Sequence, residues 1–344
     1  MTSTRAQWAG FAAMVAAGLL LMFGLPMVVD LFGLVQGTLF IAMAVLALSQ
    51  GFIWGYGGIM SFGQSAFFGL GAYGYAVAVI NLGDSTVPIL LAIAVPAAFA
   101  ALLGYFMFYG RISDAYVGVI TLTVTVILFN VMNSTAGDAY HIGSAQLGGF
   151  NGIPSVPPLN MPGDPATPLD PQQIWYFSSG VLIVVYVLLR GVLASRYGRV
   201  VVAIRENETR AMLLGYDPRF YKLVTFTIGG AVAGIAGCLY VNWGGFISPP
   251  VFGLAQSAQI IIFALLGGLG TLLGPILGAV SVQYLINAIG TQQTFNANLL
   301  LGAILMAFVL LVPQGVVPAV KALLLGLFER RGGGRLADVT ERRA

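Results

Sequence analysis

Charged residues are scarce in this sequence, and the central parts of its long apolar segments have none. Asp, Glu, Lys and Arg make up 8% of the 344 residues, and 58% are hydrophobic. Soluble domains carry about 25% charged residues. From Lys222 to Lys321 the sequence has no other Lys or Arg, and no Asp or Glu at all. This composition cannot cover a water-soluble surface, so lipid must surround most of the chain.

Cysteine and histidine occur once each, as Cys238 and His141. One cysteine excludes an intrachain disulfide, and neither residue belongs to a metal-ligand spacing. The sequence also lacks any Gly-Lys dipeptide, which excludes the phosphate-binding loop Gly-x-x-x-x-Gly-Lys-Ser/Thr. We therefore predict no catalytic residue, no metal site and no cofactor in this chain. The net charge of +3 does not indicate nucleic-acid binding, because the basic residues flank apolar segments.

Ten apolar segments are long enough, or nearly so, to cross a bilayer as helices of about 20 residues. They are residues 8–29, 34–54, 58–80, 88–109, 116–136, 174–194, 222–243, 254–273, 275–290 and 298–320. The predicted fold class is an all-α polytopic membrane protein, with a permease domain over residues 1–328 and a disordered cytoplasmic tail over 329–344. We interpret the first segment as a retained helix, with a cleaved signal peptide as the alternative.

The basic residues orient these segments, because cytoplasmic connections are enriched in Lys and Arg. Arg5, Arg111, residues 196–222 and Lys321 should face the cytoplasm. The connections near Asp30, Asp84, 138–170, Pro249 and Thr291 have no Lys or Arg and should face outward. Ten alternating crossings satisfy all of these constraints. They predict a protein of the bacterial inner membrane with both termini in the cytoplasm.

Two segments, 55–73 and 264–279, are rich in glycine, and Pro275 interrupts the second. Helix breaks persist in a membrane where protein or a water-filled cavity satisfies the freed backbone groups. The two segments occupy matching places in two halves of opposite orientation, spans one to five and six to ten. Such pairs point to a transport pathway. The alternative is close helix packing through small residues.

No ionisable residue lies in the middle of a predicted span, which disfavours proton or ion coupling. The candidate pathway is lined by neutral polar and aromatic residues, although each polar one could instead form an interhelical hydrogen bond. These candidates are Ser61, Gln64, Ser65, Phe67, Phe68, Asn130, Asn133, Gln256 and Gln259. Active transport would then take its energy from another subunit. A stand-alone carrier or channel is the alternative.

The cytoplasmic segment 195–219 is predicted to form a short amphipathic helix followed by a turn. Helical spacing places Ile204, Glu208, Ala211, Met212 and Gly215 on one face, and a Glu206–Arg210 pair on another. Such a helix suits a groove on a partner, or it lies on the lipid surface.

The outward connection 137–173 is rich in Pro and Gly, so no helix is expected there. Its length suggests either an ordered functional loop or a passive tether.

Four ordered motifs between about residues 35 and 315 resemble the LivM-type permeases of branched-chain amino acid ABC importers. They are Gly-Ile-Met-Ser-Phe-Gly-Gln-Ser-Ala-Phe-Phe-Gly-Leu-Gly-Ala-Tyr at 58–73, Gly-Gly-Phe-Asn-Gly-Ile at 148–153, the segment 199–215, and Leu-Leu-Gly-Gly-Leu-Gly-Thr-Leu-Leu-Gly-Pro at 265–275. The family more often has Ser-Leu-Gly-His where this chain has Ser-Phe-Gly-Gln at 61–64, so a histidine role there is absent. Permeases for urea and short-chain amides share these motifs.

The resemblance implies a subunit without enzymatic activity of its own. Its expected partners are a sister permease in a heterodimer, two cytoplasmic ATP-binding subunits and a periplasmic solute-binding protein. The residues expected to couple to the ATPase are Arg205, Glu206, Asn207, Glu208, Ala211 and Gly215. The expected solute is a branched-chain amino acid, or else urea or a short-chain amide, with a sugar as the third alternative.

Overall fold

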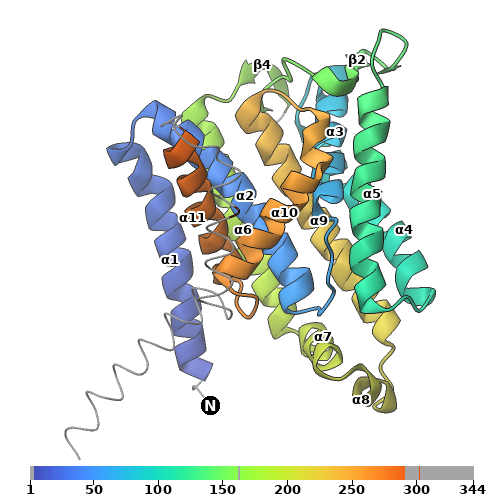
Figure 1. The fold of residues 1–344 in the computed structure, drawn as a ribbon. Coiled ribbons are helices and arrows are strands. Elements are labelled where there is room, and N and C mark those ends of the chain that lie inside the picture. The colour runs from blue at the N-terminus through green and yellow to red at the C-terminus, as the bar shows by residue number, and fades with distance from the viewer. Residues whose placement is uncertain (1–3, 162, 291–301, 303–344) are drawn as a thin grey trace, which may run out of the picture.

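The computed structural model describes residues 4–161, 163–290 and 302, and most of them are helical, which confirms the predicted all-α fold class (Figure 1). The α-helices are α1 (Thr4–Val28), α2 (Leu31–Gly55), α3 (Gln64–Leu82), α4 (Thr86–Tyr109), α5 (Asp114–Ser134), α6 (Pro171–Ala194), α7 (Arg196–Glu206), α8 (Glu208–Leu213), α9 (Pro218–Gly244), α10 (Leu254–Gly267) and α11 (Leu273–Gly290).

Among the described residues, seven helices are long and apolar enough to cross a membrane, namely α1 to α6 and α9. The eighth and ninth predicted spans correspond to the shorter helices α10 and α11. Apart from residue 302, the predicted span 298–320 and the tail 329–344 lie outside the described residues. Ten crossings therefore stays a prediction.

Local sequence signals set several helix starts. Asp30 and Asp217 cap α2 and α9 by accepting hydrogen bonds from the backbone N–H groups of Gly33 and Arg219. Asp170 and Gln173 form a reciprocal capping box at the start of α6. These short polar residues set the first residue of each helix, so the observed bounds lie close to the predicted ones.

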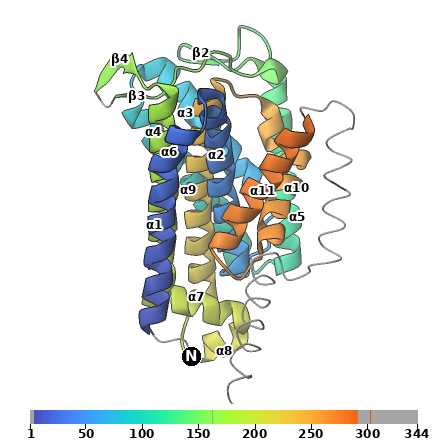
Figure 2. The same ribbon diagram turned by 90° about the vertical axis from the view of Figure 1, so that its left-hand side faces the viewer.

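Helix α2 is the centre of the bundle, and every residue from Ile41 to Ile53 is buried. It packs against α9, α11, α6, α10 and α3. Figure 2 shows α1 at one edge of the bundle and the α10–α11 pair at the other. Helix α1 packs mainly on α6, where the Trp175 indole N–H donates to the Met22 carbonyl and Phe11 stacks on Tyr186.

The two ends of the bundle differ in composition. One, called here the basic end, carries Arg111, α7 and α8. The other, called the loop end, carries residues 137–170, which contain the hairpin β1 (His141–Ile142) and β2 (Ala145–Gln146), the 3-10 turn η1 (Gly149–Asn151), and the hairpin β3 (Asn160–Met161) and β4 (Asp164–Pro168). Ile153, Val156 and Leu159 are buried, so this loop packs on the helices beneath it.

Helices α3 and α10 both begin inside the bundle rather than at its ends (Figure 1). The chain leaves α2 at the basic end, passes through residues 56–63 without helix, and starts α3 at Gln64. It leaves α9 at the loop end, passes through 245–253 with the 3-10 turn η2 (Pro249–Phe252), and starts α10 at Leu254. The two starts meet at a hydrogen bond of 2.6 Å between the Ser65 and Ser257 hydroxyl groups, both fully buried.

The residues before these two helix starts repeat each other. Gly-Gly-Ile-Met-Ser at 57–61, Phe-Gly at 62–63 and Gln-Ser-Ala at 64–66 recur as Gly-Gly-Phe-Ile-Ser at 244–248, Phe-Gly at 252–253 and Gln-Ser-Ala at 256–258. Because α3 runs toward the loop end and α10 toward the basic end, the two halves have opposite orientations. The helices follow the same scheme: α4 packs on α3 and α9, as α11 packs on α10 and α2. The matching breaks therefore precede α3 and α10, while the glycines near Pro275 form the turn between α10 and α11.

Helices α3 and α9 approach closely at glycine positions. A Cβ atom at Gly237 would overlap the Phe68 carbonyl oxygen and lie 2.7 Å from the Ala72 backbone nitrogen. Neither atom can move away, because both belong to helical backbone. Glycine here therefore fixes the distance between the two helices.

We expect Gly237→Ala to destabilise the fold by roughly 1–3 kcal/mol, the usual cost of overpacking. Gly180→Ala on α6 is the matched control, because an added Cβ there meets nothing within 4 Å. Thermal unfolding in detergent should show a lower midpoint for Gly237→Ala, and an unchanged or higher one for Gly180→Ala. Equal midpoints for both variants would contradict the packing described here.

The Ser65–Ser257 bond can be measured by a double-mutant cycle. Each single Ser→Ala change leaves one buried hydroxyl without this partner, so each should destabilise the protein, whereas the double change removes both groups. A coupling energy on the order of 1 kcal/mol is expected for a bond between membrane helices. Additive effects of the two changes on unfolding in mixed micelles would show that the hydroxyls do not interact.

Candidate functional site

The segment 195–219 forms two helices, α7 and α8, where one was predicted. The break lies at Asn207, whose backbone is extended. Its side-chain oxygen caps α8 by accepting a hydrogen bond from the Arg210 N–H at 2.8 Å. The predicted Glu206–Arg210 pair is wrong, because the break ends the helical spacing between them. Glu206 instead bonds to its neighbour Arg205.

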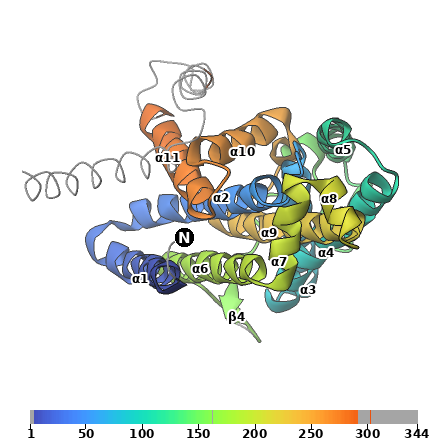
Figure 3. The same ribbon diagram turned by 90° about the horizontal axis from the view of Figure 1, so that it is seen from below.

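One side of the segment packs on the bundle. Val200, Ile204 and Ala211 are buried and form a cluster against Tyr221 at the start of α9. The Tyr197 hydroxyl donates to the Tyr221 carbonyl at 3.0 Å. Burial raises the pKa of Tyr197 to about 12, so this hydroxyl stays protonated and uncharged. Tertiary contacts therefore hold α7 and α8 in place across the basic end, as Figure 3 shows.

An ion-pair network joins α8 to two spanning helices. The Lys222 ammonium of α9 lies 2.6 Å from Glu208 of α8 and 3.2 Å from Asp114 at the start of α5. The lysine side chain is only 13% exposed, so water screens these pairs less than it would a fully exposed pair. Glu208 is thus an internal contact of this chain.

The opposite side of α8 presents apolar side chains to solvent. Leu213 is 83% exposed, Leu214 is 73% exposed and Met212 is 49% exposed. Gly215 follows with a φ of +89°, a conformation that favours glycine. Exposed leucines at the charged end of a bundle indicate a contact surface. We call residues 212–214 the apolar tip.

The predicted coupling residues therefore lie in different environments. Arg205 reaches back to helix α2, Asn207 caps α8, and Ala211 is buried. Glu206 faces solvent with a side chain that is 65% exposed. The sequence reasoning missed Leu213 and Leu214. Their signal was two adjacent leucines just before a glycine in an otherwise charged segment.

The predicted pathway residues divide into two groups. Ser61, Gln64, Ser65, Phe67 and Phe68 are all at most 1% exposed. Gln64 donates to the Ser49 hydroxyl at 3.0 Å and to the Gly229 carbonyl at 3.1 Å. The Gln50 amide donates to the Ser61 carbonyl at 2.8 Å. These bonds satisfy the Ser61 carbonyl and the two glutamine amide N–H groups where the chain enters the bundle without helix, while the Gln50 and Gln64 side-chain oxygens have no partner among the described residues.

The other four lie farther out. Asn130 is on an exposed side of α5, and its amide donates to the Val126 carbonyl. Asn133, Gln256 and Gln259 are half-buried, and Gln259 donates to Gln283 at 3.3 Å. The structure brings together Ser65 and Ser257, and the nine predicted residues range from fully buried at the start of α3 to exposed on α5. Ser257 was missed, although the repeated Gln-Ser-Ala could have indicated it.

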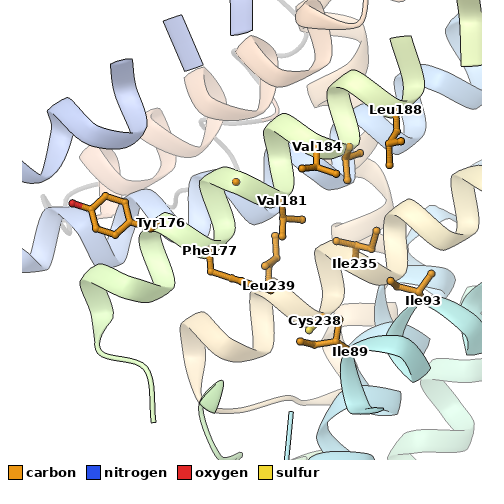
Figure 4. A pocket seen from close by; sticks show the side chains of 12 residues that line it. Ile89, Ile93, Tyr176, Phe177, Val181, Val184, Leu188, Ile235, Cys238 and Leu239 are labelled. Atoms are coloured by element: carbon orange, nitrogen blue, oxygen red, sulfur yellow. The ribbon is translucent and has the colours of Figure 1, made fainter. Parts of the chain in front are cut away.

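A cavity of about 510 Å³ opens between α4, α6 and α9 (Figure 4). Its walls are aliphatic, including Ile89, Val181 and Ile235, and Tyr176 lies at one end. A zwitterionic or amide solute needs several polar partners when it leaves water. This groove does not suit such a solute. In the described part of the chain, no three His, Cys, Asp or Glu residues lie close enough together to hold a metal.

Known proteins with similar sequences identify the family to which this chain belongs. The family described as "Branched-chain amino acid transport system / permease component" matches residues 33–310. The high-affinity branched-chain amino acid transport system permease protein LivM of Escherichia coli (strain K12) is 30% identical over 312 residues, covering 82% of this chain and 69% of LivM. A probable LivM of Methanocaldococcus jannaschii is 25% identical, covering 80% of this chain and 90% of that protein.

Two further relatives come from other transport systems or subunits. The permease protein LivH of Escherichia coli (strain K12) is 28% identical over 152 residues, covering 42% of this chain and 46% of LivH. The ribose import permease protein RbsC of the same organism is 26% identical over 236 residues, covering 65% of this chain and 68% of RbsC. No solved structure matches. The helical bundle, the helix breaks before α3 and α10, and a family match over most of the chain agree: this chain belongs to the family of branched-chain amino acid transport system permease components.

Proposed function

We propose that this chain is one membrane subunit of an ABC importer that moves branched-chain amino acids across the bacterial inner membrane. In this proposal the chain performs no chemistry. It alternates access to the solute while two cytoplasmic ATP-binding subunits hydrolyse ATP, and a periplasmic protein delivers the solute. In the same proposal the basic end faces the cytoplasm, and both termini of the chain are cytoplasmic.

The observation that carries the proposal is the apolar tip on α8. No Asp, Glu, His, Lys or Arg lies in the middle of a described span, and Arg190 of α6 lies near the basic end of that helix. This disfavours coupling to protons and supports a partner as the source of energy. The apolar tip offers exposed leucines beside arginines at the basic end. A short helix that ends in exposed apolar residues suits insertion into a groove of a partner subunit.

The substrate proposal rests on the relatives. LivM and LivH carry the words branched-chain amino acid transport in their names. Their pairing as two permeases supports a sister permease beside this chain. Urea and short-chain amides remain the second solute class, because the sequence motifs at 58–73 are shared with their permeases. Uptake measurements with amino acids, urea and acetamide separate the two classes.

Reconstitution tests the energy source. Proteoliposomes holding the full complex should concentrate leucine, isoleucine or valine only with ATP on the side of the ATP-binding subunits. Proteoliposomes holding this chain alone should not concentrate any of them. Radiolabelled uptake measures both. Accumulation by this chain alone would contradict the proposal, and uptake of urea or acetamide in place of the amino acids would reassign the solute.

Leu214→Asp tests the apolar tip. A charged group in an apolar groove costs several kcal/mol, so we expect the ATP-binding subunits to be lost during purification of the complex. Ile142→Asp at the loop end is the control, because Ile142 is also an exposed aliphatic residue, 55% exposed. The retained ATP-binding subunits are quantified on a gel. Full retention with Leu214→Asp would show that the tip lies elsewhere, such as on the lipid surface.

A further inference from the structure

Residues 55–58 form a junction between three parts of the chain at the basic end. Gly55 ends α2, and a Cβ atom there would overlap the Leu269 carbonyl oxygen in the turn between α10 and α11. The Tyr56 hydroxyl donates to the Gly270 carbonyl in the same turn at 3.3 Å. The third part is α7, which reaches the junction through one side chain, Arg205.

Arg205 contacts the junction in two ways. Its guanidinium Nη1 donates to the Gly55 carbonyl, one of the last carbonyls of α2. A cation at this position interacts favourably with the negative end of the helix dipole. The aliphatic part of the side chain packs on Gly58, where a Cβ atom would lie 2.7 Å from the Arg205 Cγ.

Gly58 is required by both geometry and packing. Its φ of +69° turns the chain from α2 into the non-helical segment, and the missing side chain leaves room for Arg205. Five residues separate Gly58 from the start of α3 at Gln64. Along this stretch the Ser61 carbonyl accepts from the Gln50 amide of α2. Gly58 is therefore connected to the start of α3 by a short segment that is bonded to the bundle.

The same arginine also contacts the residues that lead to α8. Its Nε donates to the Glu206 carboxylate at 3.1 Å, directly before the Asn207 break and α8. Arg199 of α7 bonds instead to the Ala194 carbonyl at the end of α6, next to its own helix in sequence. Arg205 thus joins α7 to Gly55, 150 positions away at the end of α2, directly before the non-helical segment that leads to α3.

We infer that Arg205 is a positioning residue that transmits movement of α7 and α8 to the α2–α3 break and to the α10–α11 turn. It does this through the Gly55 carbonyl and the Gly58 backbone. This inference rests on the proposed function, and it separates docking from transmission: the apolar tip binds the ATP-binding subunit, while Arg205 passes the movement on to the bundle.

Arg205→Gln in the full complex tests the inference. Glutamine removes the charge and the guanidinium group but stays polar. We expect normal assembly, a normal thermal midpoint and continued ATP hydrolysis, with solute uptake per ATP reduced roughly tenfold, the effect of losing one charge-assisted hydrogen bond. Arg205→Lys should restore part of this ratio, because its ammonium can still donate to Gly55.

Arg196→Gln is the matched control, because Arg196 is an exposed arginine at the far end of the same helix. It should leave uptake per ATP unchanged. An unchanged ratio in Arg205→Gln overturns the inference, and so does loss of the ATP-binding subunits or a lowered midpoint, which would assign Arg205 to docking or to folding. If the unmodified complex shows no ATP-dependent uptake, the proposed function itself fails.

Discussion

The structure depends on satisfying backbone groups where two helices begin inside a lipid-facing bundle. Lipid offers no hydrogen bonds, so the non-helical segments 56–63 and 245–253 must find partners within the protein. Gln50 supplies one for the first segment, and Ile153 pairs with Ile247 in the second. Helix α2 packs against α9, α11, α6, α10 and α3, which explains why it is buried along most of its length, while the turn η2 of the second segment packs on α5 and α3.

The polar residues at these breaks form part of the structure. Ser65, Ser257 and Gln64 are buried and bonded to other helices, whereas a solute pathway needs polar groups that become accessible. A bond between the starts of two oppositely directed half-helices is nevertheless well placed to separate when the halves move. The buried Ser65–Ser257 contact and the exposed side of α5 with Asn130 are therefore two distinct features of the bundle.

At the basic end, packing divides the cytoplasmic segment between internal and external contacts. Ala211 and Glu208 face the bundle, while Leu213 and Leu214 face away from it. A helix of six residues has little stability alone. Lys222 and the cluster on Tyr221 hold it in position, so the orientation of the apolar tip is fixed by spanning helices. This connection suits the transmitting role that we propose for the segment.

The sequence by itself determined the all-α class, most helix bounds and the sides of the basic segments, because hydropathy, charge and capping residues such as Asp30 and Asp170 act locally. It did not determine the break at Asn207, the contact of Arg205 with Gly55, or the meeting of Ser65 with Ser257. Each of these joins groups that are distant in the chain, or depends on which of several neighbouring groups forms a hydrogen bond. Only packing the helices around α2 decided them, because a side chain's partners depend on which helix faces it.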